Sequence, residues 1–100
     1  MIKHIVIFKL SAPYTPEEKA AAVKRLHEIF EPLGKKLSFI VEYRAGINIL
    51  NAEHAGDLVI DSLFSSIDDL KRYQSSREHQ DAVSEASSIR KTKIVVDYIV

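Results

Sequence analysis

The chain has 100 residues, with 14 lysines and arginines balanced by 14 aspartates and glutamates, so its formal charge is zero. The sequence has no basic stripe with interleaved aromatic residues, which argues against nucleic-acid binding. The lack of cysteine excludes disulfide bonds and thiolate metal sites. No segment has the layout of a secretion signal or the roughly 18 apolar residues of a membrane span, so we expect a cytoplasmic protein without membrane or nucleic-acid partners.

The first predicted strand, residues 2–10, has apolar side chains on both of its faces. One face carries Ile2, His4, Val6, Phe8 and Leu10, and the other carries Lys3, Ile5, Ile7 and Lys9. Such a strand is typical of the centre of a sheet that is covered on both sides.

Residues 15–33 carry the clearest helix signal. Thr15 is a suitable N-cap, Pro16 suits the first helical position, and Glu18 completes a capping box. Gly34 is expected to end the helix. One apolar stripe, directed at the sheet, comprises Val23, Leu26, Phe30 and Leu33.

The second half of the chain predicts three strands and two short helices. Residues 37–49 are extended, with Gly46 marking a bulge or bend, and residues 57–64 form the next strand. A helix capped by Ser65 or Ser66 follows, and the Ser75-Ser76 break begins another, roughly 78–88. Residues 92–100 form the last strand.

The resulting order is βαββαβ in one domain, residues 1–100. We therefore predict an α+β fold, ferredoxin-like, with a four-stranded antiparallel sheet and helices on one face. The opposite face would expose apolar side chains such as Ile5 and Ile7. An uncovered apolar face needs a partner, and a homodimer through the sheet face is the simplest solution.

Three polar residues fall on predicted inward faces and could carry chemistry. His4 shares its face with Val6, Tyr73 follows Leu70, and His79 begins a stripe on the last helix. An imidazole can exchange a proton near neutral pH, and a phenol can donate a hydrogen bond to an enolate oxygen. The alternative is that these groups are satisfied structural side chains.

The other candidates are weaker. His27 fits a partly exposed helix position and His54 lies in a loop, and the histidine spacing predicts no metal site. Asp61 and Asp97 are isolated in strands, which favours exposure or pairing with lysine. No nucleotide-binding or nucleophile-elbow motif is present, and no cofactor is expected.

Three segments resemble the stress-responsive A/B barrel (Dabb) family of the dimeric α/β-barrel superfamily. They are the opening MIKHIVIFKL, the block DLVIDSLFSSIDDLKRYQSSREHQDAV and the closing VVDYIV. The resemblance covers essentially the whole chain and implies a ferredoxin-like protomer that pairs into a β-barrel dimer.

The family includes a plant polyketide cyclase that performs an aldol-type closure, so the resemblance implies site roles. His79 would be the general base, Tyr73 would hold the carbonyl or enolate oxygen, and His4 would orient the substrate. The apolar wall would include Val23, Leu26 and Phe8.

Three functions stay open. By this resemblance the chain would be a Dabb-type protein of unassigned role that binds a small apolar or carbonyl compound, a cofactor-free cyclase or isomerase, or a structural stress-related oligomer. A monooxygenase or haem-handling relative shares the fold, but residues 70–79 match Dabb better.

Overall fold

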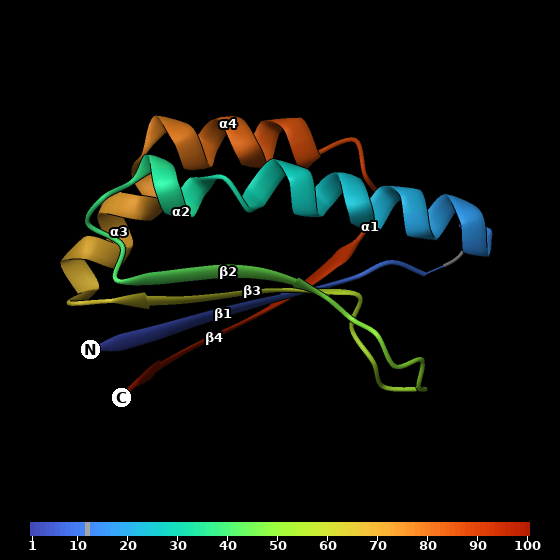
Figure 1. The fold of residues 1–100 in the computed structure, drawn as a ribbon, viewed down its shortest axis with the longest axis horizontal. Coiled ribbons are helices and arrows are strands. Elements are labelled where there is room, and N and C mark those ends of the chain that lie inside the picture. Colours follow the sequence, from blue (N-terminus) through green and yellow to red (C-terminus); the bar gives the residue numbers. More distant parts are fainter. Residues whose placement is uncertain (12) are drawn as a thin grey trace.

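The protein folds as a sheet covered on one side by helices. The computed structural model describes residues 1–11 and 13–100. Helices α1, α2 and α4 form a layer over one face of the sheet, and α3 lies at one end between β3 and α4 (Figure 1). The elements are β1 (Ile2–Lys9), α1 (Pro16–Phe30), α2 (Leu33–Lys36), β2 (Glu42–Ile47), β3 (Leu58–Phe64), α3 (Ile67–Ser75), α4 (Arg77–Ala86) and β4 (Thr92–Ile99).

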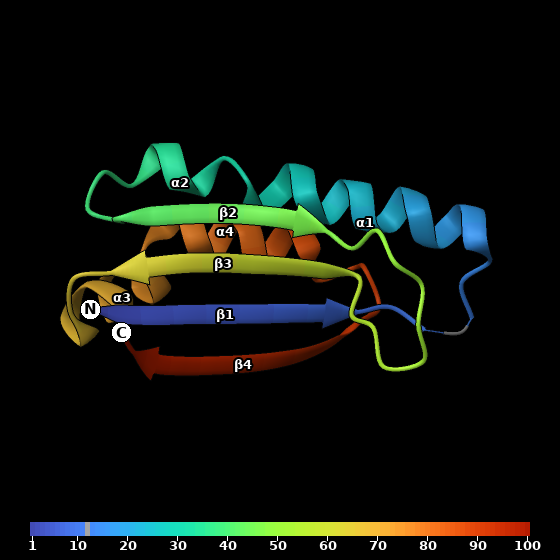
Figure 2. The same ribbon diagram turned by 60° about the horizontal axis from the view of Figure 1, so that its bottom comes forward.

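The strands lie in the order β2-β3-β1-β4 with every neighbouring pair antiparallel (Figure 2). This order confirms the predicted ferredoxin-like βαββαβ fold and the central position of β1. In the register of β1, His4 lies opposite Ser62 on β3 and opposite Asp97 on β4. Two strands therefore place polar side chains beside this histidine.

The core lies between the helices and the inner face of the sheet. Leu26 of α1 and Phe64 of β3 are completely buried, and Phe8 of β1 packs against Phe30 of α1 with ring centroids 5.5 Å apart. This burial confirms that the predicted apolar stripe of the first helix faces the sheet.

Side-chain caps begin the helices where the sequence indicates. Thr15 and Glu18 form the predicted capping box of α1. Ser66 caps α3, and Ser76 caps α4, which starts at Arg77. The caps satisfy amide groups that would otherwise lack a partner in the first helical turn.

The prediction that the first helix runs to Leu33 and ends at Gly34 is wrong. Helix α1 ends at Phe30, and Gly34 lies inside the separate helix α2, whose N-cap is Pro32. Proline has no amide hydrogen to continue the α1 ladder. Gly34 serves close packing instead, because a Cβ there would lie 2.8 Å from the Cβ of Tyr43.

The second strand is also shorter and more regular than predicted. Strand β2 begins at Glu42, and Gly46 pairs directly with Val59 without a bulge. A Cβ at position 46 would lie 3.3 Å from Cγ1 of Val59, so the small residue fits a close neighbour on β3.

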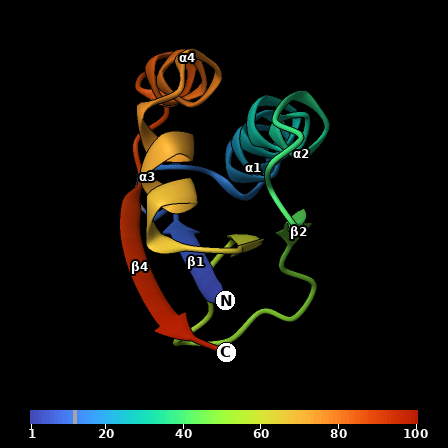
Figure 3. The same ribbon diagram turned by 90° about the vertical axis from the view of Figure 1, so that its left-hand side faces the viewer.

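The last strand lies at the sheet edge, away from α1 and α2 (Figure 3). All eight residues of β4 are exposed in the single chain. The outer sheet face is apolar near its centre, where Ile5 pairs with Val96 and Ile7 pairs with Ile94. Among the described helices, none has both the length and the apolar character needed to cross a membrane.

Candidate functional site

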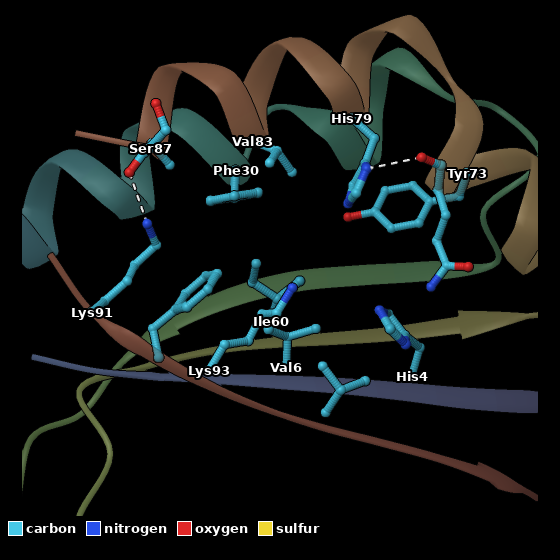
Figure 4. A pocket seen from close by; sticks show the side chains of 14 residues that line it. His4, Val6, Phe30, Ile60, Tyr73, His79, Val83, Ser87, Lys91 and Lys93 are labelled. Atoms are coloured by element: carbon cyan, nitrogen blue, oxygen red, sulfur yellow. Dashed lines mark hydrogen bonds between the residues drawn. The ribbon is translucent and has the colours of Figure 1, made fainter. Parts of the chain in front are cut away.

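A pocket of about 340 Å³ opens between helix α4 and the inner face of β1 and β4 (Figure 4). Its wall is mainly apolar, with polar groups gathered at the two ends. The lining residues are His4, Val6, Phe8, Phe30, Ile60, Tyr73, Gln74, His79, Val83, Ala86, Ser87, Lys91, Lys93 and Val95.

The structure brings the three candidate chemical residues together at one end of this pocket. His4 extends from β1, and Tyr73 and His79 extend from the α3–α4 region above it (Figure 4). The ring of Tyr73 lies between the two imidazoles, with centroids 6.2 Å from His4 and 4.6 Å from His79. A ligand in the pocket could therefore contact all three side chains.

His4 is fixed by both neighbouring strands. It is buried, with only 4% of its surface exposed, and its Nδ1 hydrogen bonds to the carboxylate of Asp97 on β4. The Ser62 hydroxyl on β3 donates to the His4 carbonyl at 3.1 Å. Since the carboxylate accepts, Nδ1 carries the hydrogen, and Nε2 is the nitrogen free to meet a ligand.

Tyr73 is a buried phenol with a phenol partner. Its hydroxyl lies 3.3 Å from the hydroxyl of Tyr43 on β2. Burial raises the pKa of both hydroxyl groups, so both stay protonated at neutral pH. Tyr73 is therefore suited to donate a hydrogen bond rather than to act as a base.

His79 has one nitrogen committed to the backbone. Its Nδ1 lies 3.1 Å from the carbonyl oxygen of Gln74, which can only accept, so Nδ1 carries the hydrogen and Nε2 keeps a lone pair. Burial lowers the pKa of His79, and the nearby His4 and Lys93 lower it further, against the opposing bond to Gln74. The side chain is therefore a neutral base at neutral pH.

Ser76 connects the two helical members of the site. Its hydroxyl donates to the Tyr73 carbonyl at 2.6 Å and accepts from the His79 amide at 3.1 Å. One side chain thus closes α3 and begins α4, which fixes Tyr73 and His79 relative to each other.

The predicted apolar wall is only partly located at the pocket. Phe8 lines it, whereas Val23 and Leu26 are buried in the core and are not among its lining residues. The pocket opens under α4 beside β4, and only Phe30 of α1 reaches it. Val23 and Leu26 instead pack inward with the other core residues.

The sequence analysis missed the role of Asp97. Asp61 pairs with Lys3 at 2.9 Å as expected, but Asp97 pairs with His4 rather than with a lysine or solvent alone. Alternation along the two strands places His4 and Asp97 on inward faces. Only the β1–β4 register, which pairs these two residues, shows that they are neighbours.

The two remaining histidines lie away from the pocket lining. His27 Nε2 is 3.0 Å from the Ala45 carbonyl, and His54 is exposed in the loop between β2 and β3. Among residues 1–11 and 13–100, no three histidine or carboxylate side chains gather into a group that could hold a metal ion.

The chain was compared with models of known protein families. Residues 2–100 match the family described as the stress responsive A/B barrel domain, Dabb. The chain belongs to this family. The match confirms the resemblance noted in the sequence and covers every strand and helix that lines the pocket. A comparison with curated proteins found no match.

Solved structures support the same fold. A dimeric ferredoxin-like protein of unknown function from Bacteroides fragilis is 31% identical, with a TM-score of 0.85 over 99% of this chain and 95% of that one. A dimeric ferredoxin-like protein of unknown function from Thermobifida fusca is 18% identical, with a TM-score of 0.80 over 99% and 90%. A hydroxynitrile lyase from Passiflora edulis is 14% identical, with a TM-score of 0.75 over 99% and 92%.

Proposed function

We propose that this Dabb protein binds a small carbonyl compound in the α4–β4 pocket and transfers a proton next to the carbonyl group without a cofactor. The observation that carries the proposal is the convergence of His4, Tyr73 and His79 on one pocket end, with a free lone pair on His79 Nε2. A neutral imidazole and a protonated phenol are the base and the hydrogen-bond donor that this reaction needs.

The reaction would proceed in two steps, through an enolate. His79 Nε2 takes a proton from the carbon beside the carbonyl, and the C–H electron pair forms the enolate. Tyr73 donates a hydrogen bond to the oxygen that becomes negative. The imidazolium then returns the proton to carbon. In an aldol-type closure the enolate carbon instead bonds to a second carbonyl carbon of the same molecule, and the imidazolium gives its proton to the alkoxide that forms on that carbonyl oxygen.

His4 and Asp97 would position the substrate. The carboxylate holds the Nδ1 hydrogen of His4, which directs Nε2 at the pocket. Both side chains come from neighbouring strands, so the orientation of His4 depends on the β1–β4 register.

Deuterium exchange tests the proposal without knowledge of the natural substrate. We expect the protein to accelerate deuterium uptake from D₂O beside the carbonyl of acetophenone or benzylacetone, followed by proton NMR. His79→Gln should abolish the acceleration and Tyr73→Phe should reduce it by about 10²-fold, since one oxyanion donor is lost. His54→Gln, in the exposed loop, is the matched control. Equal exchange in wild type and His79→Gln would refute the base.

A binding protein without turnover is the second candidate. Tyr73 already has Tyr43 as a hydrogen-bond partner, and His79 Nδ1 has Gln74, so both side chains are satisfied without a ligand. In this case apolar carbonyl compounds should raise the melting temperature with the logarithm of their concentration once it exceeds Kd, and they should show no accelerated deuterium exchange.

We also propose a homodimer through the outer sheet face. The described relatives from Bacteroides fragilis and Thermobifida fusca are dimeric ferredoxin-like proteins. In this chain the outer face exposes Ile94 by 61% and Val96 by 49%, beside Ile5 and Ile7 on β1. Pairing two such faces would remove contiguous apolar surface from water.

A further inference from the structure

The pocket has a second polar end that the proposed chemistry does not use. Lys91 lines it at the end opposite His4 and Tyr73, and the side chain of Lys93 extends from β4 toward the middle of the pocket (Figure 4). Apolar side chains, including Val6, Ile60 and Val95, lie along the wall. The cavity is therefore cationic at one end and bears the histidines and the phenol at the other.

No acidic side chain of the described part of the chain balances the positive charge of these two lysines. Neither lysine takes part in an ion pair within residues 1–11 and 13–100. Asp97, also on β4, is bound to His4, and Glu85 of α4 pairs with Arg25. The carboxylates of the two elements that flank the pocket are thus engaged elsewhere or lie outside its lining.

The two lysines are held differently. Lys91 Nζ donates to the carbonyl oxygens of Ala86 at 2.7 Å and Ile89 at 3.1 Å, which ends α4 and leaves one N–H direction free. Partial burial lowers the pKa of Lys91, and the charge of Lys93 lowers it further. A bound anion would relieve this mutual repulsion.

We propose that the ligand of this pocket is an anionic amphiphile, with a carboxylate or similar anion bound by Lys93 and Lys91 and its carbonyl group at His79 and Tyr73. This inference rests on the proposed function for the carbonyl end only. Lys93 is paired with Phe8 of β1. Phe8 is four residues from His4, so the backbones of Lys93 and His4 are about 13 Å apart along the strand. A separation of about 8 to 10 Å between carbonyl and carboxylate fits once the lysine side chains reach inward.

The charge selectivity can be measured with a matched pair of ligands. We would titrate the protein with 9-oxodecanoate, a methyl ketone with a distant carboxylate, and with its methyl ester, by calorimetry or ¹⁵N NMR. The acid should bind about tenfold more tightly than the ester, and added salt should weaken only the acid. Lys93→Gln should reduce the preference to less than about twofold, whereas Lys93→Arg should retain it.

Lys24→Gln provides the control for net charge, since Lys24 is exposed on α1 and does not line the pocket. It should leave the acid preference intact. Lys93 is exposed, so replacing it should leave the fold unchanged. Replacing Lys91 would also remove its hydrogen bond to the Ala86 carbonyl at the C-terminus of α4. Equal binding of acid and ester, an unchanged preference in Lys93→Gln, or no binding of either compound at millimolar concentration would overturn the inference.

The two proposals fail separately. An acid preference that depends on Lys93, in a protein that catalyses no deuterium exchange, would leave the anion subsite standing and remove the proton-transfer function. Exchange that depends on His79, with acid and ester bound alike, would leave the reaction standing and overturn the subsite.

Discussion

Ser76 offers the sharpest test of how the fold holds the site. Its hydroxyl caps α4 through the His79 amide and also donates to the Tyr73 carbonyl. Replacing a serine N-cap with alanine costs about 1 kcal/mol. The second hydrogen bond adds about 0.5–1 kcal/mol, because the Tyr73 carbonyl keeps the Ser76 amide as a partner at 3.1 Å. We therefore expect Ser76→Ala to lower the free energy of unfolding by about 1.5–2 kcal/mol.

Ser66→Ala is the matched control within the same chain. Ser66 caps α3 through the Asp69 amide at 3.1 Å, and the bond lies outside the pocket lining. It should cost about 1 kcal/mol, measured by urea unfolding at equal protein concentration, and leave deuterium exchange unchanged. Ser76→Ala should lower stability and also slow exchange, because the hydroxyl that bonds to both the Tyr73 carbonyl and the His79 amide is absent. Equal exchange rates in the two variants would refute the positioning role of Ser76.

Three further outcomes are expected. Burial keeps the pKa of His79 below its ordinary 6.5, so the stability that neutral His79 contributes is complete above pH 6.5. This stability is lost as the pH falls toward the folded pKa, because the unfolded chain then binds more protons. His79→Gln should therefore reduce the pH dependence of the free energy of unfolding, measured with urea. Val96→Lys on the outer face should convert dimer to monomer in sedimentation velocity, whereas Ile49→Lys, 90% exposed in a loop, should not. Leu26→Ala should cost about 2–5 kcal/mol because Leu26 is fully buried. Val83→Ala, at the half-exposed pocket wall, should cost about 1 kcal/mol or less in the same unfolding assay.

The sequence predicted those parts of the fold that depend on local patterns. The capping box at Thr15, the cap at Ser76 and the two-sided apolar pattern of β1 each act within a few residues, so the order and type of elements could be read directly. The error at Gly34 arose because glycine serves both helix ends and close packing, and only the contact with Tyr43 distinguishes the two.

The sequence predicted which polar residues meet at the pocket better than it predicted the apolar residues that line it. Inward periodicity placed His4, Tyr73 and His79 on faces that do meet at one pocket. Asp97 and Lys93 were missed because their positions depend on the pairing of the first strand with the last, across more than 90 residues for His4 and Asp97. Sequence periodicity predicts which face of a strand a residue lies on. The residue beside it on the next strand depends on the register, which periodicity does not give.

Strand β4 connects the site to the proposed dimer. Its inner face supplies Asp97 and Lys93 to the pocket region, and its outer face supplies Val96 to the apolar surface. In the single chain the strand is an exposed edge, held mainly by its ladder with β1. A partner packed on the outer face would restrain β4, and with it the carboxylate that orients His4. We therefore expect Val96→Lys to slow deuterium exchange together with dimer loss, although residue 96 faces away from the pocket.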